Sequence, residues 1–383
     1  MTTQPIRITH IITALPRGGA QTVLQQLLRR GDPRRVQMDV VSLADIGAVG
    51  ERLIADGFRV RALGMRRGSP NPMALWRLAG WLRQGRPDLV QTWLYHGDLV
   101  GGLAARLAGI PVLWNLRQTD LDPAHTGAGT LWTMRACARL SHRIPRRIVS
   151  CSEATARIHV ALGYDRDRLL VIPNGVDLER FHPAAEARQE VRAALGLDAN
   201  VPLVGLFARF HPQKDHASFL AAIRTVANAC PEAHYLLCGE GIDGGNAVLG
   251  EWVRASGVPG RIHLLGIRDD VPHLAAALDL AVSSSSFGEG FSNVLVEAMA
   301  CGTACVTTDV GDSGRIVGKT GWVVPARQPA ALGQAIVDAL ADRPGLAARG
   351  REARARVEAE YSISAMVERY QNLYEGVARG AQT

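Results

Sequence analysis

Lysine is nearly absent from this chain of 383 residues, because only Lys214 and Lys319 occur among its 43 basic side chains. An enzyme that uses pyridoxal phosphate needs a lysine for the Schiff base, so such an enzyme would have to use one of these two. Aromatic residues are also few, at 5%. Hydrophobic residues nevertheless make up 47% of the chain, which is enough for two cores in domains of about 150 to 200 residues each.

Cysteine pairs and long apolar runs are missing as well. The six cysteines form no Cys-x2-Cys pair and have no histidines at zinc-site spacing. No run reaches the roughly 18 apolar residues of a membrane span, and residues 1–5 lead into a strand without the features of a secretory leader. We therefore expect reduced thiols, no metal site and a cytoplasmic protein.

Charge is distributed unevenly along the chain, whose net charge is +7. Residues 1–170 contain 24 arginines and 12 acidic residues, whereas the remainder contains 19 basic and 24 acidic residues. A basic surface is typical of proteins that contact anionic lipid headgroups, a lipid-linked diphosphate or nucleic acid. A general bias toward arginine explains the same counts equally well, so peripheral contact with the inner face of a membrane stays open. Nucleic acid is not an expected partner.

Short apolar runs alternate with helical segments, which predicts parallel sheets wound by helices. The expected strands are 6–13, 38–43, 59–63, 89–93, 112–116 and 147–151, then 203–208, 234–239, 262–266, 280–283, 304–307 and 321–324. Six strands in each half predict an α/β fold of two Rossmann-like, doubly wound domains facing across a cleft, at residues 1–175 and 176–360. The turn-rich segment 172–177 is the expected hinge, and ligands are expected beyond the carboxyl ends of the strands.

Two glutamates eight residues apart, Glu289 and Glu297, lie around a glycine turn and a helix start. Free backbone amides at this helix start would hold a phosphate; they belong to Gly290, Phe291, Ser292 and Asn293. Amides for a diphosphate and two carboxylates for hydroxyl groups suit a nucleotide sugar. The alternative is an ordinary capped helix with two solvated glutamates.

Two cations follow the predicted strand 203–208. Arg209 ends this strand and Lys214 lies five residues later, just before a helix that begins near Asp215. Fixed cations at a strand end would stabilise the negative charge that a leaving nucleotide gains. Exposed loop cations are the alternative.

A glycine-rich turn at 239–244 matches G-x-G-x-x-G, the fingerprint of dinucleotide-binding folds. It follows the second strand of its domain instead of the first, and no acidic residue ends the next strand. Both facts disfavour a dehydrogenase.

The whole set of motifs resembles glycosyltransferase family 4, a family of retaining enzymes with the GT-B fold, over about residues 6–374. The resemblance rests most on Glu289-x7-Glu297, on the serine run before it and on the Ala-Cys-Gly turn after it. It implies that Arg209 and Lys214 hold the donor diphosphate, Glu297 the ribose and Glu289 the sugar. It further implies that Gly239 and Gly241 line the donor site, that Ile267 and Arg268 bracket the base, and that Gly18 and Gly19 approach the diphosphate and acceptor.

A helix is predicted at 99–108, after strand 89–93. The resemblance also implies that the first domain binds the acceptor, with His96 between this strand and this helix, and that a last helix at about 361–378 joins that domain. Arg117 is a departure, since many family members have histidine there; it could bind an acceptor phosphate or the donor. Asp120 belongs to an Asp-x-Asp that we assign to the acceptor side, with no metal and no cofactor.

The expected reaction moves a hexose or N-acetylhexosamine from a nucleotide sugar to a glycan or lipid-linked acceptor in polysaccharide biosynthesis, with UDP favoured and GDP-mannose as the alternative. A sugar phosphorylase and a non-catalytic glycan- or nucleotide-binding scaffold are alternatives of other classes.

Overall fold

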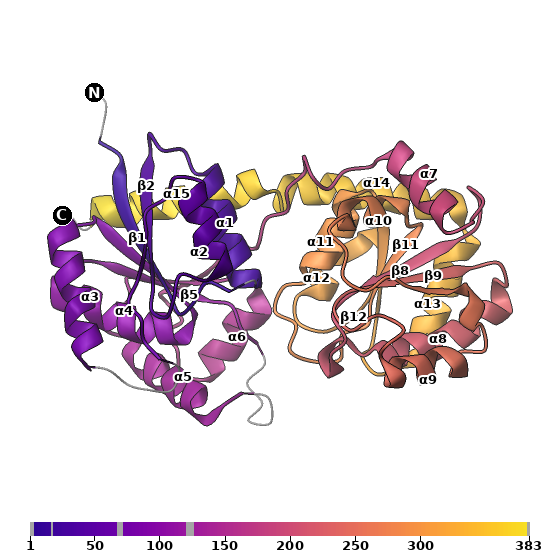
Figure 1. The fold of residues 1–383 in the computed structure, drawn as a ribbon, viewed down its shortest axis with the longest axis horizontal. Helices are drawn as coiled ribbons and strands as arrows, with labels where there is room; N and C mark the ends of the chain where they lie inside the picture. Colours follow the sequence, from indigo (N-terminus) through magenta and orange to yellow (C-terminus); the bar gives the residue numbers. More distant parts are fainter. Residues whose placement is uncertain (1–3, 17, 67–71, 120–125, 381–383) are drawn as a thin grey trace. The chain divides into compact units, whose positions relative to one another are not determined.

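Two compact units make up the chain (Figure 1). The computed structural model describes residues 4–16, 18–66, 72–119 and 126–380. The first unit contains Met1–Gly175 and Ile363–Thr383, and the second contains Val176–Ser362. The chain first crosses between units inside the turn-rich segment 172–177. It crosses back beside that point, because Val176 forms a parallel bridge with Ser362.

The first unit is built on a seven-stranded parallel sheet with the order β3-β2-β1-β4-β5-β6-β7. Its strands are β1 (Ile6–Ile12), β2 (Val36–Ser42), β3 (Val60–Ala62), β4 (Leu89–Trp93), β5 (Val112–Leu116), β6 (Arg147–Ser150) and β7 (Leu169–Val171). The six predicted strands are confirmed, whereas the prediction of only six was wrong. The seventh, β7, was not predicted; it is an edge strand of three half-buried residues that follows a charged turn.

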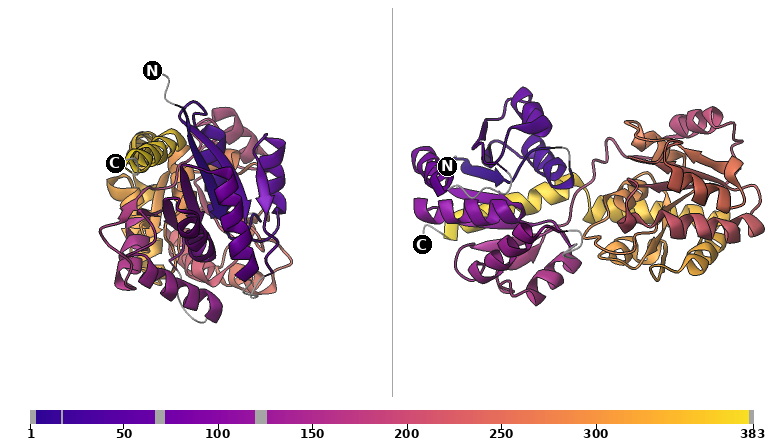
Figure 2. Two further views of the ribbon diagram at one scale, coloured as in Figure 1. Left: turned by 90° about the vertical axis from the view of Figure 1, so that its left-hand side faces the viewer. Right: turned by 60° about the horizontal axis from the view of Figure 1, so that its bottom comes forward.

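Helices cover both faces of this sheet, as the alternation of elements predicted. On one face lie α1 (Gly19–Arg30), α2 (Gly47–Ala55) and α15 (Ile363–Gly380), which share a core with the sheet. On the other lie α3 (Pro72–Gly85), α4 (Leu94–Ala108) and α5 (Ala128–Leu140). Helix α6 (Glu153–Ala161) connects β6 with β7. Figure 2 shows the last helix, α15, against the first unit.

The second unit has a six-stranded parallel sheet with the order β10-β9-β8-β11-β12-β13. Its strands are β8 (Leu203–Phe207), β9 (His234–Cys238), β10 (Ile262–Leu264), β11 (Leu280–Ser283), β12 (Ala304–Thr308) and β13 (Trp322–Val324). Its helices are α7 (Ala185–Ala194), α8 (His216–Ala229), α9 (Ala247–Ala255), α10 (Val271–Ala277), α11 (Asn293–Ala300), α12 (Ser313–Val317), α13 (Pro329–Ala341) and α14 (Arg343–Glu360). All six strands match the predicted ones.

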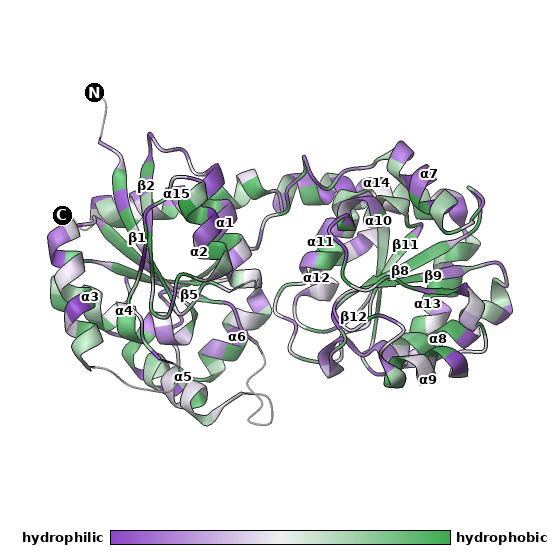
Figure 3. Ribbon diagram, in the orientation of Figure 1, coloured by the Kyte–Doolittle hydropathy of each residue, from purple (hydrophilic) through white to green (hydrophobic). Residues whose placement is uncertain are grey.

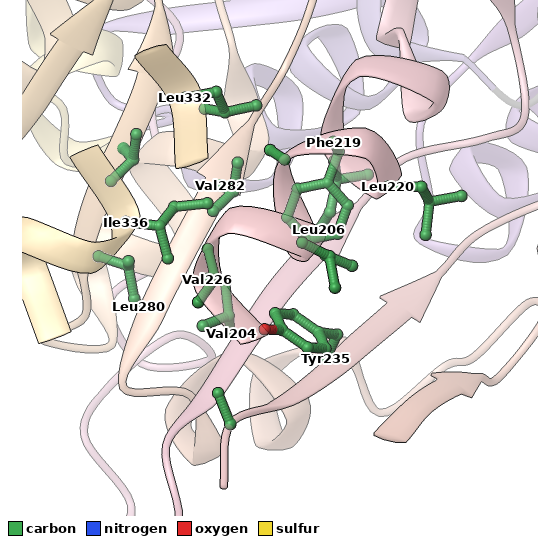
Figure 4. Packing of buried hydrophobic residues seen from close by; sticks show 14 of the residues in the cluster. Val204, Leu206, Phe219, Leu220, Val226, Tyr235, Leu280, Val282, Leu332 and Ile336 are labelled. Atoms are coloured by element: carbon green, nitrogen blue, oxygen red, sulfur yellow. The ribbon is translucent and has the colours of Figure 1, made fainter. Parts of the chain in front are cut away.

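The core of the second unit forms where α8 and α13 pack on the sheet (Figure 4). Phe219 of α8 contacts Tyr235 of β9 edge-on, with ring centroids 6.4 Å apart. Figure 3 shows apolar residues along the strands of both units, as expected for parallel sheets buried on two faces. Within the described part of the chain, no helix is both long enough and apolar enough to span a bilayer.

Each sheet reverses its strand order at one place, between β1 and β4 in the first unit and between β8 and β11 in the second. In open parallel sheets, ligands bind at this switch point, beyond the carboxyl ends of the strands. The loops after β8 and β11 carry Lys214 and Glu289. Gly19 and His96 lie in the first turns of α1 and α4, the helices that follow β1 and β4. The topology therefore places predicted site residues at both switch points.

Candidate active site

A buried ion pair lies at the switch point of the second unit. The ammonium group of Lys214 donates to Oε2 of Glu289, and Ser285 Oγ donates to the same oxygen at 2.9 Å. Only 8% of Glu289 is exposed. Two residues that the sequence analysis assigned separately to diphosphate and sugar thus contact one another.

The serine run after β11 holds the turn that carries Lys214. Ser284 Oγ donates to the Lys214 carbonyl at 2.7 Å, and the Ser286 amide donates to the Gln213 carbonyl at 2.8 Å. Thr308 Oγ1 fixes the run from β12 by donating to the Ser285 carbonyl at 2.6 Å. The positioning role of these serines was not predicted from the sequence. Their placement directly after a buried strand was the available signal.

The loop after β12 packs against the backbone of Glu289. Gly311 has φ +65°, and a Cβ added there would lie 1.6 Å from the Glu289 carbonyl oxygen. The Asp312 amide donates to the Gly290 carbonyl at 3.3 Å. The glycine at 311 is therefore required for the backbone that positions Glu289.

Replacing Gly311 with alanine is expected to destabilise the protein by roughly 2–4 kcal/mol, because the methyl group would overlap the Glu289 carbonyl. Urea unfolding followed by circular dichroism measures the loss. Gly257→Ala is the matched control, since its φ is +84° but its Cβ would meet nothing within 4 Å. That variant should lose only about 1 kcal/mol. If Gly311→Ala and Gly257→Ala lost equal stability, the overlap between the new methyl group and the Glu289 carbonyl would cost nothing, and the prediction would be wrong.

The amino end of α11 carries no side-chain cap. The Ser292 hydroxyl at this end is buried and has no hydrogen-bond partner among the described residues. Phe291 packs edge-on against Tyr361, with ring centroids 5.7 Å apart, so its side chain belongs to the core. An uncapped helix end with positive dipole charge is suited to an anion.

Glu297 lies inside α11, and part of its surface still contacts solvent. Burial nevertheless raises its pKa to about 7, and the nearby positive charge of Arg180 opposes this shift. The carboxyl group therefore changes its charge near neutral pH.

Arg209 lies just beyond β8 and is exposed. Among the described residues it has no hydrogen-bond or ion-pair partner for its guanidinium, unlike Lys214. An uncompensated cation at the same sheet edge as α11 adds to the positive potential there.

The glycines after β9 are needed for backbone packing. A Cβ on Gly239 would lie 2.2 Å from the Ala208 carbonyl oxygen, and Gly241 has φ +72°. The Gly239 amide donates to the Gly266 carbonyl at 2.8 Å, which ties together the loops after β9 and β10. Packing alone thus explains Gly239, and a role for the two glycines in lining the donor site stays a prediction.

The loop after β10 presents an apolar side chain to solvent. Ile267 is 73% exposed, and Arg268 is paired with Asp270 at 2.6 Å. An exposed isoleucine at this edge could pack on a flat base, so its predicted role remains consistent with its position.

In the first unit, β1 and β4 bring the predicted acceptor residues to one edge. Gly18 precedes α1, and a Cβ on Gly19 would meet no described atom within 4 Å. Packing therefore does not explain Gly19. The predicted start of the next helix at residue 99 was wrong, because α4 begins at Leu94 and places the exposed His96 in its first turn.

Arg117 is held by neighbours within the first unit. Its Nε donates to Asn115 at 2.8 Å and its Nη2 to the Tyr370 hydroxyl at 2.7 Å, while Nη1 donates to Asn174. The guanidinium also lies over the Trp93 ring, 4.9 Å from its centroid. This network was not predicted; it joins β5 to α15 and to the segment before the first crossing between the units. The proposed binding of a phosphate by Arg117 stays a prediction, and Asp120 lies outside the described residues.

Among the described residues, no group of three or more His, Cys, Asp and Glu side chains could hold a metal ion. The aspartate at position 122 of the predicted Asp-x-Asp lies outside those residues, as does Asp120.

Comparison with solved structures identifies the fold class. HepE of Anabaena in complex with UDP superposes with a TM-score of 0.85 at 22% identity, covering 97% of this chain and 100% of that chain. The complex of the same protein with UDP-glucose superposes with a TM-score of 0.81. The two units therefore form a GT-B fold.

Two family models match the sequence. Residues 17–180 match the family described as Glycosyltransferase Family 4, and residues 201–342 match Glycosyl transferases group 1. The chain belongs to glycosyltransferase family 4 and is a glycosyltransferase of the hexosyltransferase type. The family favours sugar transfer over the phosphorylase and scaffold alternatives.

Relatives by sequence act on different donors. The "Putative glycosyltransferase EpsF" of Bacillus subtilis is 29% identical over 79% of this chain and 79% of its own length. The UDP-Gal:alpha-D-GlcNAc-diphosphoundecaprenol alpha-1,3-galactosyltransferase of Escherichia coli is 26% identical over 62% of this chain and 61% of its own. A GDP-mannose-dependent monoacylated alpha-(1-6)-phosphatidylinositol monomannoside mannosyltransferase of Corynebacterium glutamicum is 32% identical over 54% of this chain and 56% of its own.

Proposed function

We propose that this glycosyltransferase moves a hexose or N-acetylhexosamine, with retention of configuration, from a UDP-sugar to a glycan or lipid-linked acceptor. The observation that carries the proposal is the Lys214–Glu289 pair at the switch point of the second unit, beside the uncapped amino end of α11. A diphosphate needs cations and free amides, whereas a sugar needs carboxylates that accept from its hydroxyls. The carboxyl edge of the second sheet carries the cations, the free amides and the carboxylates together.

In the proposed reaction, the diphosphate displaces the Lys214 ammonium from Glu289 and takes it as its own counter-ion. Glu289 is then free to accept hydrogen bonds from the sugar, and Glu297 accepts from the ribose hydroxyls. The bond from the anomeric carbon to the diphosphate oxygen breaks as the acceptor oxygen forms its bond on the same face. The departing phosphate oxygen takes the acceptor's proton. Lys214 and Arg209 stabilise the negative charge that gathers on this leaving group.

The donor base is proposed from the relatives. The UDP complexes of HepE and the UDP-Gal-dependent relative support a uridine nucleotide. GDP-mannose is the second candidate, because a relative at 32% identity is named for it. The transfer is proposed to need no cofactor and no metal. We also propose that the enzyme works at the inner face of the membrane, where a lipid-linked acceptor would be presented.

A thermal-shift screen of UDP- and GDP-sugars is the test of the donor. The true donor should raise the unfolding midpoint, since ligand at 100 times its Kd stabilises the folded state by about 2.7 kcal/mol. Arg209→Ala should weaken this shift, while Arg224→Ala, an exposed arginine of α8, should leave it unchanged. The absence of any shift with every nucleotide sugar, together with the absence of released UDP or GDP in the presence of acceptor glycans, would overturn the proposal.

A further inference from the structure

The outer surface of α3, α4 and α5 in the first unit is basic, and we call this surface the basic helix layer. Its exposed arginines are Arg77, Arg83, Arg106, Arg135 and Arg139. The three helices contain a single acidic residue, Asp98, which is buried and accepts a hydrogen bond from Thr92 at 2.5 Å. Their exposed surface therefore carries positive charge and no carboxylate.

The arginines of the basic helix layer lack counter-ions. Among the described residues none of the five forms a salt bridge. Three of them donate to backbone carbonyls instead: Arg77 to Leu63 at 2.8 Å, Arg83 to Leu107 at 2.6 Å and Arg106 to Arg143 at 3.2 Å. A neutral acceptor leaves the positive charge of each guanidinium available to an external anion.

On the opposite face of the same sheet, arginines do form ion pairs. There Arg29 of α1 pairs with Asp56 at 2.6 Å, and Arg35 pairs with Glu368 and Glu375 of α15, each at 2.7 Å. A general bias toward arginine would affect both faces alike. In the part of the chain that the structure describes, the arginines of one face alone are without ion pairs, which indicates a surface with a partner.

Large apolar side chains lie on the same basic helix layer. Met73 and Trp76 of α3 are 79% and 60% exposed, and Trp132 of α5 is 66% exposed. All three lie within the first two turns of helices that follow strands of the parallel sheet, so they lie near its carboxyl edge. Helix α4 contacts both α3 and α5, so it lies between them. Trp76 and Trp132 are therefore two helix spacings apart, or about 20 Å.

We propose that the basic helix layer docks on an anionic phospholipid bilayer. Arginines attract the headgroups, and tryptophan is suited to the interface because its ring is apolar while its N–H needs a polar partner. A nucleic acid would use the arginines but would leave Met73 in water. Docking by Met73, Trp76 and Trp132 would bring the carboxyl edge of the first sheet, with Gly19 and His96, toward the lipid surface.

Vesicle flotation of the full chain tests this proposal without donor or acceptor, so its outcome is independent of the transfer reaction. Vesicles of phosphatidylcholine with about 30 mol% phosphatidylglycerol should bind the protein, and pure phosphatidylcholine should not. Bound protein should show a blue shift of tryptophan emission, and salt should weaken the binding.

Two pairs of substitutions separate the apolar from the electrostatic contribution. Trp76→Ser with Trp132→Ser should weaken binding at least tenfold and abolish the blue shift, whereas Ile54→Ser, an exposed residue of α2, should change neither. Arg135→Gln with Arg139→Gln should weaken binding roughly 25-fold, at about fivefold per arginine. The control pair Arg224→Gln and Arg254→Gln removes the same charge from the second unit and should have little effect.

All the replaced side chains are exposed, so circular dichroism and the thermal midpoint should match those of the unchanged protein. Failure to bind anionic vesicles would overturn the proposal. So would equal binding by the tryptophan variant and the unchanged protein. Binding of DNA or heparin without binding of vesicles would identify a different partner and would overturn it as well.

Discussion

Replacing Lys214 with alanine is expected to lower kcat/KM for sugar transfer by roughly 10²–10³-fold, the usual cost of removing one group that stabilises transition-state charge. Lys214 is the cation in contact with Glu289 at the switch point, and the only other lysine, Lys319, lies at the amino end of β13. No second lysine can therefore take its place. Release of the nucleotide from the donor identified by thermal shift, measured with and without acceptor, gives the rate.

The same substitution affects stability, because it leaves the Glu289 carboxylate buried without its cation. Breaking a buried ion pair in this way costs about 3–5 kcal/mol, reduced here by the hydrogen bond from Ser285. The double variant Lys214→Ala with Glu289→Gln should recover most of the lost stability, since a neutral amide needs no counter-ion. It should not recover transfer. Recovery of the rate along with the stability would show that Lys214 only supports the fold.

Most of the fold could be predicted because buried parallel strands are short apolar runs that alternate with helices. Twelve of the thirteen strands follow this pattern. β7 does not, because an edge strand of three residues has no buried stretch to reveal it. The start of α4 was also misplaced. Leu94 there adopts φ +68° directly after β4, and a helix that begins without a capping residue gives no signal in the sequence.

The site could be predicted residue by residue but not as a set of contacts. Lys214 and Glu289 lie 75 positions apart, and only the strand order β8-β11 makes them neighbours. The close approach of Gly311 to Glu289 depends on the loop after β12, which carries no chemical motif. Arg117 shows the same limit, because its partners Asn174 and Tyr370 come from distant parts of the chain.

Glu297→Gln is expected to stabilise the protein at pH 8 while lowering kcat/KM for transfer by roughly 10²-fold, the loss typical of a positioned charged acceptor. The pKa of this carboxyl is raised from 4.5 to about 7 in the folded protein. Its ionisation thus opposes folding increasingly between pH 4.5 and 7, and fully above pH 7. Removing that charge should contribute on the order of 2 kcal/mol at pH 8, after allowance for partial exposure, and almost nothing near pH 4.5.

Ionisation of Glu297 lowers stability but should strengthen binding of the donor. Only the ionised carboxylate accepts two hydrogen bonds from ribose hydroxyls. In the unchanged protein, KM for the donor should rise as the pH falls through about 7. Urea unfolding at pH 8 and pH 5 and donor titrations across this range give both readouts. Glu289→Gln is the matched control: its carboxylate is paired with Lys214, so losing it should destabilise the protein at pH 8. If Glu297→Gln were also less stable at pH 8, the burial of this carboxyl would not oppose its charge, and the predicted rise of KM as the pH falls through about 7 would be wrong.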